Sequence, residues 1–115
     1  MAKGNSVWIL FLILVCVGVV SGCKDLKGIW IDSQAQRATD NNQFDKAVSL
    51  YQQLIDMEPG NYSNYWNLAS VYLKKKDVKM VEKQLVKIRS LKEDEVADDL
   101  EKALKKLKDE LKEGK

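Results

Sequence analysis

Two cysteines and no histidine limit the chemistry that this chain could perform. Cys16 lies inside an apolar run, and Cys23 follows directly after Ser21 and Gly22. A cysteine thiolate is a nucleophile that other enzymes can modify. The absence of histidine excludes a His-based triad and His metal ligands, and the serines and aspartates show no spacing typical of a nucleophile and its base. We therefore expect no catalytic residues, no metal site, no cofactor and no enzymatic activity.

An apolar run without charged residues, Val7 to Val20, lies near the start of the chain. A single charged side chain, Lys3, precedes it and small residues follow it. This is the three-part layout of a secretory signal peptide. A membrane-spanning helix needs about 20 apolar residues, so the run is short for a span. An uncleaved signal that anchors the protein in the inner membrane stays an alternative.

The residues Val20-Ser21-Gly22-Cys23 resemble the lipobox of bacterial lipoproteins, an aliphatic residue and two small residues before a cysteine. The resemblance implies removal of residues 1–22 as a signal peptide. It also implies that Cys23 becomes an N-terminus with acyl chains such as palmitate on its sulfur and amine, in a tether of residues 23–29.

Lys24 replaces the aspartate that tends to retain lipoproteins at the inner membrane. The resemblance therefore implies a cell-envelope protein, on the periplasmic face of the outer membrane where the host has two membranes. Without Lys3, the 19 basic side chains become 18 against 17 acidic ones. This balance does not favour nucleic acid as a partner.

From Trp30 onward, apolar residues recur at helical spacing and no segment alternates as a strand would. The pattern predicts an all-α fold with helices at about residues 31–41, 45–57, 63–75, 78–91 and 94–113. The last two could form one bent helix, because no proline or glycine separates them. Ser90 and Glu93 form a capping-box pattern that favours a restart.

The apolar positions repeat with a period of 34 residues, which indicates a helix-turn-helix unit used twice. Every pair is apolar or aromatic: Ile31 with Tyr65, Ala35 with Ala69, Ala38 with Tyr72, Ala47 with Val81, Tyr51 with Leu85, and Leu54 with Ile88. A generic helical bundle with chance spacing is the alternative.

The types of these residues resemble the tetratricopeptide repeat family. Ala35 and Ala69 stand where its paired helices touch most closely, Tyr51 stands at an aromatic position, and Pro59 follows the second helix. Val81, Leu85 and Glu93 depart from the pattern. Over about residues 28–93 the resemblance implies a right-handed α-α superhelix. Its parts would be repeat 1 at residues 30–61, repeat 2 at 62–93 and a capping helix at 94–115.

Members of this family bind ligands in a groove lined by the first helix of each repeat. Carried over by position, the resemblance assigns a protein-binding groove to Asp32, Gln36, Thr39, Trp66, Asn67, Ser70 and Lys74. Trp66 follows the core-facing Tyr65 and so points elsewhere, where an indole suits an extended peptide. Alternatively, Trp66 packs against the fifth helix or the first repeat.

The fifth helix carries a leucine stripe that could cover the fourth helix. Acids crowd its start and lysines follow, which complements the helix dipole. The pairs Asp98–Lys102 and Glu101–Lys105 stand four residues apart. Because acids interleave with the lysines, we do not expect a basic tail for nucleic acid.

The sequence thus predicts a membrane-anchored adaptor or assembly factor of the bacterial cell envelope. Its partner would be a peptide or an envelope assembly component, and its lipid anchor would attach it to the membrane. Two alternatives remain: a structural protein that self-associates as a homodimer through the fifth helix, and a signal-anchored inner-membrane protein.

Overall fold

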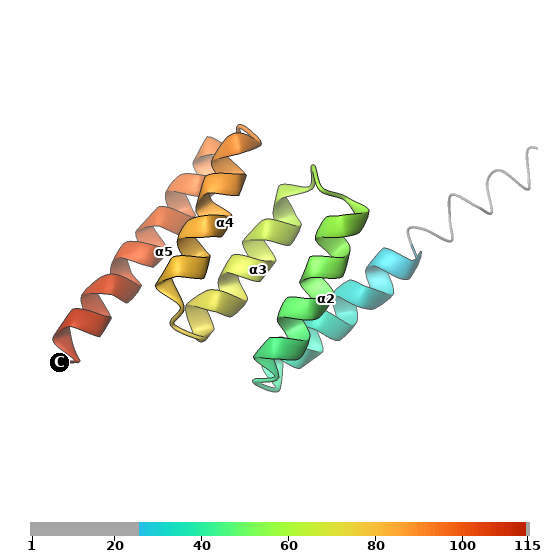
Figure 1. Ribbon diagram of the computed structural model, residues 1–115, viewed down its shortest axis with the longest axis horizontal. Helices are drawn as coiled ribbons and strands as arrows, with labels where there is room; N and C mark the ends of the chain where they lie inside the picture. Colours follow the sequence, from blue (N-terminus) through green and yellow to red (C-terminus); the bar gives the residue numbers. More distant parts are fainter. Residues whose placement is uncertain (1–25, 115) are drawn as a thin grey trace, which may run out of the picture. The chain divides into compact units, whose positions relative to one another are not determined.

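Five helices and no strands form the part of the chain that the computed structural model describes, residues 26–114 (Figure 1). The helices are residues 26–40, Phe44–Met57 (α2), Tyr62–Lys74 (α3), Val78–Ser90 (α4) and Asp94–Glu113 (α5). The all-α prediction is confirmed. The expected signal peptide and Cys23 lie outside the described residues.

The first helix begins earlier than the sequence analysis predicted. A tether over residues 23–29 and a helix start at about Ile31 were expected, whereas the chain is helical from residue 26. Gly28 lies within this helix, because one glycine costs only about 0.5–1 kcal/mol relative to alanine. The chain divides into two units at Trp30, and the second unit is Ile31–Lys115. The folded repeats belong to the second unit.

Two turns with the same backbone geometry stand 34 residues apart. Asn42 and Lys76 both adopt the left-handed conformation with φ of 59°. In each turn the next amide donates a hydrogen bond to the carbonyl five residues earlier, as in a Schellman motif. The bonds are Gln43 N to Ala38 O at 2.8 Å and Asp77 N to Tyr72 O at 2.9 Å. The 34-residue period is therefore present in the backbone conformation of the turns as well as in the types of the side chains.

The residues that recur every 34 positions form the core. All of the twelve paired positions are buried except Leu85, which is half-buried. Ala35 and Ala69 are fully buried, as expected where helices approach closely. Val81 is also fully buried, so α4 forms even though Val81 departs from the small residue of the family pattern.

A short turn separates α4 from α5, so they are two helices. Lys92 stands in this turn with φ of 62°. The predicted capping box is wrong, because Glu93 is the N-cap of α5 and makes no side-chain cap hydrogen bond. The Ser90 hydroxyl instead donates to the Lys87 carbonyl at 2.6 Å. Serine hydroxyls bond back to carbonyls of their own helix in this way.

Helix α5 packs against α4 and α3 (Figure 1). Its buried residues are Ala97, Leu100, Leu104 and Leu107. They lie at spacings of three and four, which places them on one face of the helix. α5 thus covers the end of the repeats, as the leucine stripe predicted.

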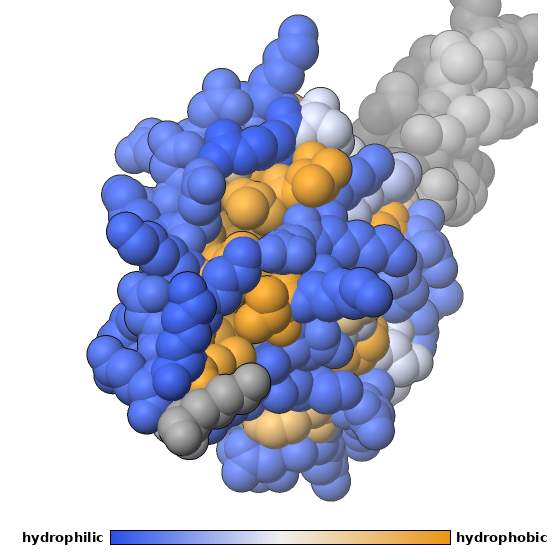
Figure 2. Space-filling model, turned by 60° about the vertical axis from the view of Figure 1, so that its left-hand side comes forward, coloured by the Kyte–Doolittle hydropathy of each residue, from blue (hydrophilic) through white to orange (hydrophobic). Residues whose placement is uncertain are grey.

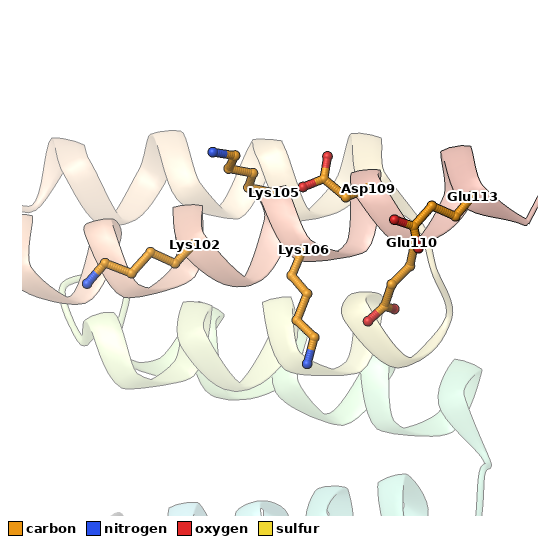
Figure 3. Close-up of a pocket in the computed structure, with 6 residues that line it drawn as sticks. All are labelled: Lys102, Lys105, Lys106, Asp109, Glu110 and Glu113. Atoms are coloured by element: carbon orange, nitrogen blue, oxygen red, sulfur yellow. The ribbon is translucent and has the colours of Figure 1, made fainter.

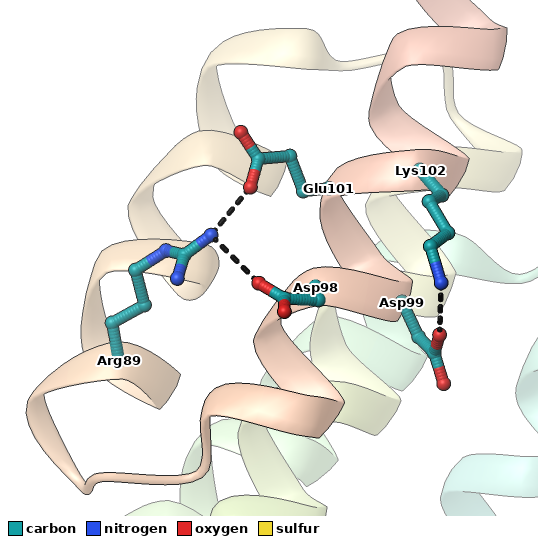
Figure 4. Close-up of polar contacts among 5 residues, drawn as sticks. All are labelled: Arg89, Asp98, Asp99, Glu101 and Lys102. Carbon is teal, nitrogen blue, oxygen red and sulfur yellow. Dashed lines mark hydrogen bonds and ion pairs between the residues drawn. The ribbon is translucent and has the colours of Figure 1, made fainter.

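The charged side chains of α5 pair differently from the prediction. Arg89 of α4 bonds to Asp98 at 3.3 Å and to Glu101, while Lys102 pairs with Asp99 at 3.1 Å (Figure 4). The predicted pairs within α5, Asp98–Lys102 and Glu101–Lys105, are therefore replaced. The neighbouring helix brings a guanidinium, whose several donors can bond two carboxylates at once. A sequence pattern within one helix could not show this.

Candidate functional site

The seven residues assigned to a binding groove come from two helices of the second unit. Asp32, Gln36 and Thr39 lie on the helix of residues 26–40, and the other four lie on α3. Gln36 and Lys74 are exposed, and Thr39 is buried. The remaining four are half-buried. Polar groups on both helices therefore remain accessible, with Thr39 as the exception.

The three residues of the first helix bond within that helix. Gln36 Nε2 donates to Asp32 Oδ2 at 2.7 Å, and Thr39 Oγ1 donates to the Ala35 carbonyl at 2.8 Å. Burial raises the pKa of Tyr51 above its ordinary value, the charge of Asp32 adds to the rise, and a hydrogen bond with Thr39 opposes it. Thr39 thus serves the core beside Tyr51, while Asp32 and Gln36 bond to each other on the surface of the first helix.

Four side chains follow one another along one side of α3. We call this set, Trp66, Asn67, Ser70 and Lys74, the α3 polar face. Trp66 is half-buried and packs against the core, so one part of its indole stabilises the fold and the other part is accessible at the surface. The Ser70 hydroxyl donates to the Trp66 carbonyl at 3.0 Å. An amide and an ammonium group, on Asn67 and Lys74, complete the face.

The opposite side of α3 forms the floor of a furrow between α2 and α4, which the sequence analysis missed. Tyr65, Leu68 and Tyr72 recur at three and four residues, about half a helical turn away from the α3 polar face. We call this hollow the α2–α4 furrow. Its lining residues are Gln52, Ile55, Tyr65, Leu68, Tyr72, Met80, Lys83, Gln84, Val86, Lys87 and Ser90.

The furrow is apolar at its floor and basic at one wall. Lys87 Nζ lies 5.6 Å from the centre of the Tyr65 ring, within the range of a cation–π contact. The Tyr65 hydroxyl donates to the Pro59 carbonyl at 2.7 Å, which ties α3 to the preceding turn. Burial raises the pKa of Tyr65 and of Tyr72 above their ordinary values. Tyr65, Leu68 and Tyr72 are themselves buried, so the prediction that this stripe faces the core is confirmed. The furrow arises because α2 and α4 flank the stripe, which no pattern within one helix shows.

A shallow depression on α5 has the character of a solvated surface. Its six lining residues all come from this one helix and comprise three lysines and three acids (Figure 3). They are Lys102, Lys105, Lys106, Asp109, Glu110 and Glu113. All are exposed, and their charges balance. Such a surface has no excess positive charge to attract a nucleic acid backbone.

Hydrophobic surface on the side that carries α4 and α5 is divided into strips by hydrophilic side chains (Figure 2). On α4, the side chain of Val86 is 69% exposed. On α5, Leu111 is the one large hydrophobic residue that is exposed, at 37%. Most of the apolar side chains of the α5 stripe are therefore buried against the other helices of the chain.

Residues 26–114 contain neither a metal-binding cluster nor a membrane-spanning helix. No group of three or more histidine, cysteine, aspartate or glutamate residues in this range is placed to hold a metal ion. None of its helices is both long enough and apolar enough to cross a membrane.

Comparison with known proteins gave one match. The family model described as tetratricopeptide repeat matches residues 38–104, which is more than half of the chain. The match runs through α2, α3 and α4 and into the first half of α5. No curated protein and no solved structure matched the chain.

Proposed function

Since this chain belongs to the tetratricopeptide repeat family, we propose that it is a membrane-anchored adaptor or assembly factor of the bacterial cell envelope. Repeats of this family mediate binding between proteins, and their all-helical fold is typically a scaffold without enzymatic activity. The partner would be a peptide or an assembly component that docks on the α3 polar face. Asp32 and Gln36 would extend this site onto the first helix.

The α3 polar face is the observation that carries this proposal. Its indole is anchored on the core but half-exposed, which keeps the entropy cost of ordering it on binding low. Rigid aromatic anchors of this kind dominate the energetics of many interfaces. The amide of Asn67 can bond a peptide backbone, and the ammonium of Lys74 can bond an acidic side chain or a carboxyl terminus.

The membrane anchor is proposed from Val20-Ser21-Gly22-Cys23 and from the apolar run before it. Acylation of Cys23 would attach the repeats to a bilayer without a spanning helix. Mass spectrometry of the N-terminus tests this proposal. We expect a chain that starts at Cys23 with an added acyl mass, and Cys23→Ser should abolish that mass. An intact residue 1 in the membrane form would instead support an uncleaved signal anchor.

Site-specific photo-crosslinking in the native envelope tests the docking site. A photoreactive residue at Lys74 should capture one defined protein, and the same residue at Lys105 on the α5 surface is the matched control. Capture from Lys74 should be lost in Asn67→Arg, which adds bulk and charge to the α3 polar face. Capture that occurs equally from both positions, or that survives Asn67→Arg, would contradict the proposed site.

Self-association through α5 is the second candidate, because Leu111 remains exposed near the end of that helix. A homodimer held there should dissociate in Leu111→Lys and should be insensitive to Asn67→Arg. Mass measurement of the detergent-solubilised protein separates this candidate from the adaptor. A monomer in both variants and in the unaltered protein would rule it out.

A further inference from the structure

Three large hydrophobic side chains are exposed within five residues of one another on the first helix. Leu26, Ile29 and Trp30 are 67%, 66% and 62% exposed. They belong to the first unit, which ends at Trp30. Isolated apolar residues on a surface need no explanation, but a cluster of this kind marks an interaction surface.

The spacing of the three residues places them on one side of the helix. Leu26 precedes Ile29 by three positions and Trp30 by four, and side chains three and four apart are neighbours on a helix. Gly28 lies between them in the sequence but on the opposite side of the helix, since each residue turns the helix by about 100°. Lys27, which is exposed, stands beside this patch and not within it.

The position of the patch along the chain indicates what covers it. Leu26 is three residues after Cys23, and three residues of fully extended chain reach at most about 11 Å. If Cys23 carries the acyl anchor, Leu26 cannot be farther than this from the lipid surface, and Trp30 lies about 6 Å further along the helix. An uncleaved apolar run that ends at Val20 would hold the patch near the same surface.

We propose that Leu26, Ile29 and Trp30 insert into the interfacial layer of the bilayer to which the chain is attached. The proposal rests on the membrane attachment proposed above. Tryptophan favours the headgroup level of membranes, because its ring is apolar and its N–H can donate a hydrogen bond. Leu26 and Ile29 supply apolar area beside it, and Lys27 supplies a cation for anionic headgroups. The patch thus fixes the start of the helix on the membrane as a second contact beside the anchor.

Fluorescence of a single tryptophan tests this inference in the full chain. The chain has three tryptophans, so Trp8→Phe with Trp66→Phe leaves Trp30 as the only one. The membrane-attached protein is reconstituted into vesicles of phosphatidylcholine and phosphatidylglycerol with brominated acyl chains. We expect bromine near the headgroup end of the chains to quench Trp30 by about twofold or more relative to unbrominated vesicles.

Two matched proteins provide the controls. With Trp8→Phe and Trp30→Phe, only Trp66 remains, and its emission should be quenched much less, because Trp66 lies on α3 and outside the patch proposed to contact the bilayer. Adding Leu26→Ser and Ile29→Ser to the Trp30 protein should reduce its quenching, since the patch then loses its aliphatic part. Trp30 emission at short wavelength without quenching would mean that protein, such as a second copy, covers the patch. That result, or emission typical of water, would overturn the inference.

Mass spectrometry on the same preparation separates the two proposals. An acylated Cys23 together with unquenched Trp30 would refute the interfacial patch and leave the anchor standing. Quenched Trp30 on a chain that retains residue 1 would refute acylation and keep the patch.

Discussion

Replacing Lys76 by glycine should stabilise the protein, because Lys76 is held in a left-handed conformation. Its φ is 59° in the turn between α3 and α4. This conformation costs an L-residue roughly 1–2 kcal/mol, because its Cβ approaches the next carbonyl. Glycine avoids that cost but loses about 0.5–1 kcal/mol more backbone entropy on folding. The expected gain in the free energy of unfolding is about 0.5–1 kcal/mol.

Thermal unfolding followed by far-ultraviolet circular dichroism measures this gain. A change of 1 kcal/mol shifts Tm by about 4–8 °C in a domain of this size, so Lys76→Gly should raise Tm by about 2–8 °C. Lys92→Gly should give a similar rise, since its φ is 62°. Asn42→Gly should change Tm less, because asparagine already tolerates this conformation.

The matched control is Lys83→Gly, an exposed position inside α4. Glycine there should destabilise the protein by about 1 kcal/mol, as in any helix interior. If Lys76→Gly and Lys83→Gly lower Tm alike, the left-handed turn does not carry the strain that the backbone geometry indicates.

Three further predictions concern the core, the tyrosines and the interhelical ion pairs. Ile88→Ala should cost about 2–5 kcal/mol in urea unfolding, because Ile88 is fully buried, and the half-buried Leu85→Ala should cost clearly less. Burial raises the pKa of Tyr51, so the unfolded chain loses its proton first as pH rises; stability should be constant below about pH 10 and fall above it, and the fall should be shallower in Tyr51→Phe. Arg89→Ala should cost no more than about 1 kcal/mol, because its pairs with Asp98 and Glu101 are exposed, and the difference from the unaltered protein should shrink in high salt.

The sequence was sufficient for the features that depend on spacing within the chain. Ala35 and Ala69 predicted where helices meet closely, and the 34-residue period predicted which side chains are buried. These follow from the helical period and from the sizes of the side chains, both of which a sequence displays directly.

Features that depend on two elements meeting could not be predicted. The pairing of Arg89 with Asp98 and Glu101 requires the angle between α4 and α5, which no local pattern gives. The α2–α4 furrow likewise forms where side chains of α2 and α4 flank the buried stripe of α3, so its walls depend on how those helices are placed. The start of the first helix at residue 26 was missed for a different reason, since the helical spacing that served to predict the helices was recognised only from Trp30 onward.

The position of α3 between its neighbours bears on which side chains can select a partner. α3 packs against α2, α4 and α5, and its aromatic stripe faces the furrow. On its other side, Trp66 already packs on the core, and Ser70 already donates its hydroxyl proton to a carbonyl. Within residues 26–114, no hydrogen bond or ion pair of the folded chain occupies the side chains of Asn67 or Lys74. A polar group that the fold leaves unoccupied can bond a ligand without first breaking an internal contact, so these two side chains would set specificity while Trp66 supplies contact area.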